Sequence, residues 1–328
     1  MITSCYLYEA KGLDPHENLA VEQYILENLQ PGQCVLYLWQ NQNTVVIGRN
    51  QNPWVECRTT LLEDEGGILA RRLSGGGAVF HDIGNLNFTF FMADDDFNIE
   101  KQLSVIRTAC SLAGIETNSS GRNDVLAQGR KFSGNAFYHS RGNAYHHGTL
   151  LIHANMEKLQ RYLSPSKAKL EAKGVSSVRS RVINLAELSP ELTVPQMRKY
   201  MAVAFGQVYE LPVQTMQLPK NADEEIAAIK KHIGSWEYLY GTPLPFTCKI
   251  EQQFPWGNVQ LHIRAKGGIV QSLRMYTDAM DWHMPVIVEG ALTGSRFDKN
   301  DMIMRIKTAI LDPSICNDLC GMLLAQDL

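Results

Sequence analysis

Three consecutive glycines, Gly75 to Gly77, lie in the segment from Arg71 to Asn85, between two apolar runs. A run of glycines lets the backbone approach a bulky charged ligand closely and point its N–H groups at phosphate oxygens. Arg71 and Arg72 add positive charge where such a ligand would lie. The spacing is neither GxGxxG nor a Walker motif with its lysine and Ser or Thr. Spacing alone therefore favours a phosphate-binding loop no more than a plain flexible loop.

The composition is that of a folded globular chain. Its 328 residues are 45% hydrophobic and 20% charged, enough for one large domain with a smaller one attached. A formal net charge of -3 argues against electrostatic binding of nucleic acid over a broad surface. No apolar run reaches the ~18 residues of a membrane span, and the start lacks the pattern of a signal peptide. The seven cysteines are scattered and contain no CxxC pair, so we expect no disulfide framework and a cytoplasmic location. We also expect a monomer that binds neither nucleic acid nor membranes.

The pattern before and after the glycines predicts helices and strands. Asp14-Pro15 is typical of a helix start, and Asn98 to Leu112 has the apolar spacing of another helix. Residues 35–39 and 44–48 predict two strands of a hairpin. The alternation of apolar and polar residues over 86–90 predicts a half-buried strand. Strands joined mostly by hairpins, with a few long helices, indicate an α+β domain on a largely antiparallel or mixed sheet.

A second domain is predicted near the C-terminus. The turn formers from Gly241 to Pro245 mark the boundary, so we expect a large domain over residues 1–243 and an accessory domain over 244–328. The patterns of the accessory domain predict a small α+β unit, with strands over 249–254, 259–264 and 269–276 and helices over 299–310 and 314–324.

Lys131 is the first candidate for chemistry, because it opens a predicted strand after the polar loop Gly121 to Asp124. An ammonium fixed there can bridge a carboxylate substrate and a phosphate, and steady the charge that builds up when an oxygen attacks phosphorus. Asp124 is then a Mg²⁺ ligand, a partner of Lys131 or a structural turn residue. Asn123 either bonds a nucleobase or ribose, or shapes the turn.

Histidines, serines and cysteines are weaker candidates. His81 and the pair His146-His147 suggest a metal, but adjacent residues on a strand point to opposite faces and do not chelate together. Ser74 lacks the GxSxG elbow of a Ser-His-Asp triad. Cys316 and Cys320 lie four apart and fit a buried helix face better than a metal site.

Six separate stretches resemble lipoate-protein ligase A, in the order of that family. They are NTVVIGRNQNPWVEC (43–57), RRLSGGGAVFHDIGNLNFTF (71–90), GRND (121–124), RKFSGNA around Lys131, HHGTLLI (146–152) and AKGVSSVRSRVINL (172–185). FPWGNVQLHI (254–263) is similar to the start of the family's accessory C-terminal domain. The resemblance implies a mixed sheet with helices, like that of biotin-protein ligases and class II aminoacyl-tRNA synthetases.

The resemblance also implies a ligase that works in two steps. (R)-Lipoate and ATP with Mg²⁺ give lipoyl-AMP and pyrophosphate, and the lipoyl group then passes to a specific lysine of an apo lipoyl domain. Such acceptors are the E2 subunits of 2-oxoacid dehydrogenases and the glycine cleavage H protein. The reaction suits a site that excludes water, because a mixed anhydride hydrolyses easily, and the apolar acyl chain needs a hydrophobic slot.

Residue roles follow from the resemblance. Lys131 is the catalytic and ligand-binding lysine, and Arg72 contacts ATP. The other residues implied to surround ATP or lipoyl-adenylate are Ser74, Gly75, Gly76, Gly77, Ala78, Val79, Phe80, His81, Asn85, Asn123 and Asp124, the last a possible Mg²⁺ ligand. The implied lipoate pocket consists of Trp39, Gly134, Ala136, His147, Gly148 and Thr149. The loop over residues 167–182 resembles one that orders over the adenylate, and its composition predicts mobility.

Two other functions remain open at this point. An octanoyl transferase of the same fold needs no ATP but requires a nucleophilic cysteine near the lysine strand. The loop before Lys131 holds no cysteine, and we expect Cys110 to lie on a buried helix face. The second alternative is a non-catalytic binder of lipoate or lipoyl domains, against which Lys131, Arg72 and the three glycines argue.

Overall fold

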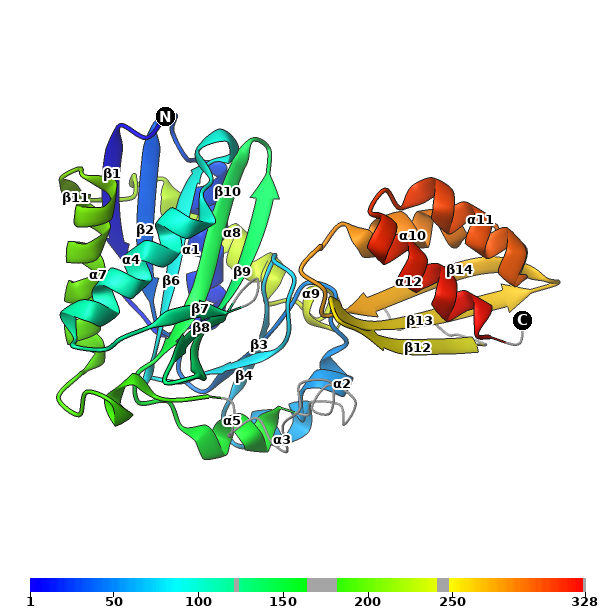
Figure 1. Cartoon of the computed structure of the whole chain (residues 1–328), viewed down its shortest axis with the longest axis horizontal. Helices are drawn as coiled ribbons and strands as arrows, with labels where there is room; N and C mark the ends of the chain where they lie inside the picture. Colours follow the sequence, from blue (N-terminus) through cyan, green and yellow to red (C-terminus); the bar gives the residue numbers. More distant parts are fainter. Residues whose placement is uncertain (121–123, 164–181, 241–247, 327–328) are drawn as a thin grey trace.

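The computed structural model describes residues 1–120, 124–163, 182–240 and 248–326. Figure 1 shows two parts, each with its own sheet and helices, which we call the N-terminal part (residues 1–240) and the C-terminal part (residues 248–326). The boundary predicted from Gly241 to Pro245 lies outside the described residues. No helix within these ranges is long and apolar enough to cross a membrane.

The N-terminal part is organised around a mixed sheet with the strand order β11-β1-β2-β6-β10-β9-β8-β7. Pairing is parallel between β11, β1 and β2, and antiparallel from β2 onward to β7. The predicted mixed sheet of an α+β fold is therefore confirmed. The strand bounds are β1 (Ser4–Glu9), β2 (Gln33–Trp39), β6 (Asn85–Ala93), β7 (Asn118–Ser120), β8 (Asp124–Ala127), β9 (Arg130–Ser140), β10 (Asn143–Leu151) and β11 (Val213–Thr215).

Helices cover both faces of this sheet (Figure 1), α4 (Ile99–Leu112) and α7 (Val194–Tyr209) on one face, α1 (Pro15–Glu27) and α8 (Ala222–Ile233) on the other. The predicted starts are confirmed by their caps, since the Asp14 carboxylate accepts from the N–H groups of His16 and Glu17, and Asn98 accepts from that of Lys101. Covered on both sides, the central strands have no water-facing side.

Strand β6 corrects one prediction. Apart from the terminal Ala93 every residue of β6 is buried, so it is not half-buried as its alternation predicts. Phe88 and Phe90 pack into the core with α4 and α7, whereas the polar residues Asn87 and Thr89 alternate with them. The polar stripe therefore lies inside the protein, where polar groups need partners.

A smaller sheet with the order β4-β3-β5 lies beside the large one and carries the glycine segment. Its strands are β3 (Thr44–Ile47), β4 (Ile68–Arg71) and β5 (Val79–His81). The predicted hairpin of residues 35–39 with 44–48 is wrong, because β2 already pairs with β1 and β6 and has no free edge for β3. The short helices are α2 (Pro53–Glu56), α3 (Thr59–Asp64), α5 (Met156–Tyr162) and α9 (Trp236–Leu239).

The C-terminal part is a three-stranded antiparallel sheet with three helices on one face (Figure 1). The strands β12 (Cys248–Phe254), β13 (Gly257–Lys266) and β14 (Ile269–Thr277) follow the predicted positions. So do α11 (Lys299–Ala309) and α12 (Pro313–Leu324), while α10 (Met284–Leu292) was not predicted. Cys316 and Cys320 lie in the apolar core, as expected.

The two parts touch at the glycine segment. The Gly76 N–H donates to the carbonyl of Ala279 at 3.2 Å, and a side chain on Gly75 would bring its Cβ within 2.4 Å of the same carbonyl oxygen. Trp282 lies with its ring 4.5 Å from the Arg49 guanidinium and 4.7 Å from the Tyr138 ring. The glycines therefore form part of the contact between the parts.

Candidate active site

Arg72, directly after β4, holds the glycine segment from its carbonyl side. Its Nη2 donates to the carbonyls of Gly75 and Gly77 at 2.7 and 2.8 Å, and its Nε donates to the Ser74 hydroxyl at 3.1 Å. Burial lowers the pKa of Arg72 to about 10, so the guanidinium remains charged at neutral pH. In the part of the chain that the structure describes, no carboxylate contacts it. The glycine segment is therefore ordered around a buried cation, unlike a plain flexible loop.

Arg71, one residue earlier, serves a different purpose. Its Nη1 donates to the carbonyls of Arg49 and Gln51, both at 2.8 Å, while Nε and Nη2 donate to the carbonyls of Tyr238 and Leu239. Only 9% of the residue is exposed. The charge of Arg71 is thus used to hold chain segments together and does not stand free for a ligand.

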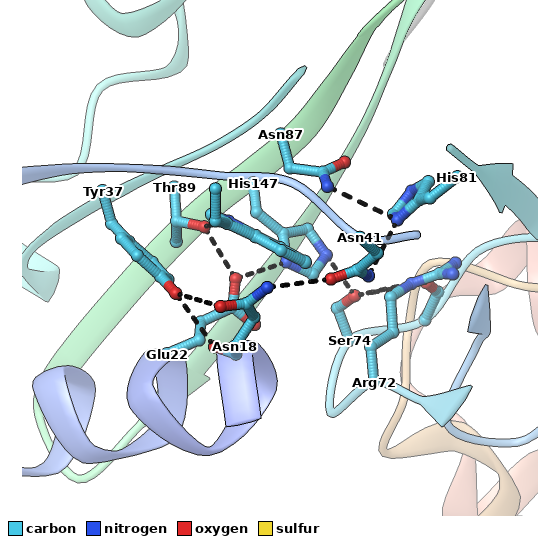
Figure 2. A network of polar contacts seen from close by, with 12 residues as sticks. Asn18, Glu22, Tyr37, Asn41, Arg72, Ser74, His81, Asn87, Thr89 and His147 are labelled. Atoms are coloured by element: carbon cyan, nitrogen blue, oxygen red, sulfur yellow. Dashed lines mark hydrogen bonds and ion pairs between the residues drawn. The ribbon is translucent and has the colours of Figure 1, made fainter. Parts of the chain in front are cut away.

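A chain of hydrogen bonds joins Arg72 to residues of the predicted lipoate pocket (Figure 2). The Ser74 hydroxyl lies 2.8 Å from Nε2 of His147, and Nδ1 of His147 lies 2.8 Å from the Glu22 carboxylate. The Thr89 hydroxyl donates to the same carboxylate oxygen at 2.7 Å and accepts from the Trp39 indole at 3.0 Å. The structure therefore brings together Arg72 and Ser74 of the loop after β4, His147 of β10 and Trp39 of β2.

His81 lies beside this chain, and its ring makes a T-shaped contact with that of Trp39 at 6.0 Å between centroids. Figure 2 shows the hydrogen bonds that reach His81 from Asn41 and Asn87. The side-chain amides of Asn41 and Asn87 lie 3.2 and 3.4 Å from Nδ1, and Asn85 in turn donates to Asn87. Since an amide NH₂ only donates, Nδ1 accepts and Nε2 carries the proton. Burial, helped by the positive Arg72, lowers the pKa of His81 to about 3 and keeps the ring neutral. Nε2–H is buried without a partner among the described residues.

Lys131 and Asp124 form an ion pair between neighbouring strands. Nζ lies 2.7 Å from Oδ1, and both side chains are partly exposed. Gly134 leaves room for the ammonium, since a Cβ there would lie 2.7 Å from Nζ, and its N–H donates to the Thr149 hydroxyl. Ile183 donates from its N–H to the Lys131 carbonyl at 2.9 Å. The chain therefore returns beside Lys131 after the stretch that is not described.

The other predicted site residues have distinct positions. The Phe80 ring is buried and packs 5.5 Å from that of Tyr162, and the residue pairs with Val45 of β3, so its side chain is not available to a nucleotide. Ala78 and Val79 are half-buried. Ala136 pairs with His147 in the sheet register, and a Cβ on Gly148 would lie 2.6 Å from Phe88. Asn123 and residues 167–181 of the predicted adenylate loop lie outside the described residues.

His146 and His147 point to opposite faces, as predicted. His146 lies 2.8 Å from both Gln102 and Asn135, on the side of α4, and burial lowers its pKa to about 3. Among the described side chains, no group of three or more His, Cys, Asp or Glu could hold a metal ion.

Glu22, Thr89, Asn87 and Asn41 were not predicted as site residues. Glu22 is 1% exposed on a helix whose buried residues are mostly apolar, and an acidic residue on such a face is a signal that it is buried with a partner. Asn87 and Thr89 are polar residues of β6, a strand that helices cover on both faces. They are therefore buried, and burial of a polar side chain is again a signal that it has a partner.

The comparisons agree with this architecture. The family described as the lipoyl protein ligase A/B catalytic domain matches residues 14–206, and the bacterial lipoate protein ligase C-terminus matches residues 244–314. The chain is 40% identical to lipoate-protein ligase A of Bdellovibrio bacteriovorus over 290 residues, which covers 86% of this chain and 85% of that protein.

Solved structures share the fold. The crystal structure of P. falciparum LipL1 in complex with lipoate superposes with a TM-score of 0.87 at 25% identity, covering 98% of this chain and 100% of that one. A lipoate-protein ligase A bound with ATP matches with a TM-score of 0.65 over 74% of this chain and 99% of that one, at 22% identity, and so supports the fold alone.

Proposed function

The chain belongs to the lipoate-protein ligase A family and is an enzyme of the ligase class, and from this premise we propose that it activates lipoate with ATP and transfers the lipoyl group to a lysine of an apo lipoyl domain. We propose further that residues 1–243 are the catalytic domain and residues 244–328 the accessory domain.

The observation that carries the proposal is the hydrogen-bond chain from Arg72 to Trp39. Arg72 and Ser74 belong to the expected nucleotide site, and His147 and Trp39 to the expected acyl pocket. A ligase must hold a carboxylate and the α-phosphate within bonding distance of each other, so the two half-sites have to be adjacent. The chain of contacts supports that adjacency.

In the first step, a carboxylate oxygen of lipoate attacks the α-phosphorus and pyrophosphate leaves. Lys131 has one of its three ammonium donors on Asp124 in the described structure, which leaves donors for the lipoate carboxylate and the α-phosphate. Its positive charge lowers the repulsion between two anions and stabilises the charge of the transition state. The Nε2–H of His81, which has no partner among residues 1–120, 124–163, 182–240 and 248–326, supplies a neutral donor for a further substrate oxygen.

In the second step, the amine of the acceptor lysine attacks the acyl carbon and AMP leaves. Trp39 lies against Tyr37 and His81, and Ala136, the register partner of His147, has only a methyl side chain, which suits a narrow slot for an apolar acyl chain. Keeping water out of that slot protects the anhydride until the amine arrives.

Magnesium fits this site as a companion of ATP. Mg²⁺ takes most of its ligands from phosphate and water and needs only one or two carboxylates. Asp124, with one oxygen on Lys131, is the residue that would hold it. When bound, the ion neutralises charge on the phosphates.

The octanoyl-transferase alternative needs a reactive cysteine, and Cys110 does not provide one. It is completely buried in the core with α7, and burial raises its pKa to about 12, so the thiolate is scarcely populated at neutral pH.

The test is transfer of lipoate to a purified apo lipoyl domain, with and without ATP and Mg²⁺, followed by AMP release and the mass of the acceptor. Lipoylation that requires ATP and yields AMP would support the ligase. ATP-independent transfer from an octanoyl carrier protein would establish the transferase, and tight lipoate binding without transfer would favour the binder.

A further inference from the structure

Glu22, His147 and Ser74 form a buried line of hydrogen bonds that begins on α1 and ends at the glycine segment (Figure 2). Glu22 is 1% exposed, His147 6% and Ser74 not at all. The sequence resemblance assigns no role to Glu22. A carboxylate that is buried away from water is stable only where its hydrogen-bond partners compensate for the lost hydration. The partners of Glu22 therefore have to explain its position.

Two groups of this line can only donate, which sets the direction of the hydrogen bonds at its ends. The Trp39 indole donates to the Thr89 hydroxyl, which gives its own proton to Glu22. The Arg72 guanidinium donates to the Ser74 hydroxyl, whose own hydrogen has two acceptors within reach, Nε2 of His147 at 2.8 Å and the Gly75 carbonyl at 3.4 Å. Nε2 is the nearer of the two.

The Glu22 oxygen that accepts from Thr89 lies 2.8 Å from Nδ1 of His147, so Nδ1 is placed to donate its hydrogen to Glu22. With Nδ1–H directed at Glu22, Nε2 is left to accept from the Ser74 hydroxyl. We therefore expect Glu22 to fix the Nδ1–H tautomer of His147.

We propose that Glu22 is a positioning residue of the activation step, which through His147 and Ser74 holds Arg72 and the carbonyls of Gly75 and Gly77 in register with the acyl pocket. This inference rests on the proposed ligase function. The Ser74 hydroxyl holds Arg72 by accepting from its Nε. Arg72 in turn holds the carbonyls of Gly75 and Gly77 by donating to them from Nη2. The nucleotide half-site is thereby tied to the wall of the acyl half-site, and a small displacement of either is expected to slow the bond-forming step.

The experiment compares Glu22→Ala and Glu22→Gln with the wild-type protein. AMP or pyrophosphate formation from lipoate and ATP gives kcat and KM, lipoate binding is measured separately, and ¹⁵N NMR reports which nitrogen of His147 carries the proton. Glu289→Ala removes a half-buried carboxylate of the C-terminal part that accepts from the Met275 N–H, and serves as the matched control.

Glu22→Ala should lower kcat by about 100-fold while lipoate binding changes by less than about threefold. Its His147 should lose the single Nδ1–H form that the wild type shows. Glu22→Gln should recover most of the rate, because the amide oxygen accepts the same two hydrogens. Glu289→Ala should match the wild type.

Several results would overturn the inference. They are an unchanged kcat in Glu22→Ala, a loss of lipoate affinity equal to the loss of rate, a wild-type His147 protonated on Nε2, or an acyl group trapped on Ser74, which would make the serine a nucleophile. If Glu22→Ala does not fold, Glu22→Gln and the wild-type NMR signal still decide. A wild type that forms no AMP would instead refute the proposed function itself.

Discussion

The N-terminal part encloses two guanidinium groups and a carboxylate, whereas the C-terminal part, over residues 248–326, encloses no charged side chain. The buried polar side chains of that second part are Gln260, Thr277 and Ser295, set in a core of aliphatic and sulfur-containing residues with the aromatic Phe254. Burial of a polar or charged group costs free energy unless it is bonded. The N-terminal part therefore contains the buried charged groups, and these groups lie at or next to the candidate active site.

The C-terminal part contributes through its surface instead. The loop after β14 brings Ala279 and Trp282 against the glycine segment and Tyr138. An apolar core makes that loop a rigid support without requiring any buried charge. Substitutions in each of the two parts can test this contrast.

The largest effect is expected at Lys131. Lys131→Ala removes the cation that we propose faces the reacting carboxylate and phosphate, and adenylate formation should fall by about 10³-fold. Lys249→Ala, which removes an ammonium paired with Glu251 on β12, should leave the rate unchanged. The measurement is lipoate-dependent AMP formation. A Lys131→Ala protein with full activity would show that the site is elsewhere.

Acid should destabilise the N-terminal part more than the C-terminal part. Burial lowers the pKa of His81 and of His146 from 6.5 to about 3, so each ring binds a proton more readily in the unfolded chain. The stability is complete above pH 6.5 and is lost as pH falls from there toward 3. At pH 5 the two rings together should cost about 4 kcal/mol relative to pH 7.

Urea unfolding at both pH values, with hydrogen exchange assigning the loss to each part, checks this expectation. His283→Gln, at an exposed ring of the C-terminal part, should not alter the difference. Equal stability of the N-terminal part at pH 5 and pH 7 would mean that one or both rings are protonated in the folded protein.

A cavity in the C-terminal core should affect that part alone. Leu261 on β13 is 1% exposed in the apolar cluster, and Leu261→Ala should destabilise the C-terminal part by about 3 kcal/mol. Val286→Ala, at a side chain that is 65% exposed on α10, is the control and should cost little. Lipoate binding measured by calorimetry should stay as in the wild type. Reduced binding would reveal that the acyl pocket depends on the C-terminal core.

The smallest effect is expected at the contact between the parts. Trp282→Ala removes one ring contact with Arg49 and one with Tyr138, together worth about 1 to 2 kcal/mol. The Gly76 amide, whose partner is the Ala279 carbonyl, should then exchange its hydrogen about tenfold faster. Trp236→Ala, at an indole outside this contact, should leave that rate unchanged. Unchanged exchange in Trp282→Ala would show that the contact rests on the backbone alone.

Local signals in the sequence predicted much of the fold. The cap at Asp14 and the apolar spacing after Asn98 gave helix starts within one residue of those observed, because capping and helical periodicity depend on neighbouring residues. The strands of the C-terminal part followed from alternation for the same reason. The hairpin of residues 35–39 with 44–48 failed because pairing depends on which strand edges are free, and that is decided by distant segments.

The candidate site could be predicted less completely. The glycines, Arg72, Ser74 and His147 do lie together, but Glu22 and Thr89 were missed because their significance arises only when α1 covers the polar stripe of β6. A carboxylate on a helix and a hydroxyl on a strand are ordinary at the surface. They become informative when the fold encloses them, which local sequence does not reveal.

Arg71 has a mechanical consequence. Its side chain ties the end of β4 to the carbonyls of Tyr238 and Leu239, only a few residues before the connection to the C-terminal part. The chain therefore leaves the N-terminal part from a point that is fixed to β4 of the smaller sheet. A pull transmitted along that connection would act first on β4 and so on the residue that follows it, Arg72. The connection to the C-terminal part and the loop that would hold the nucleotide are thus both attached to β4.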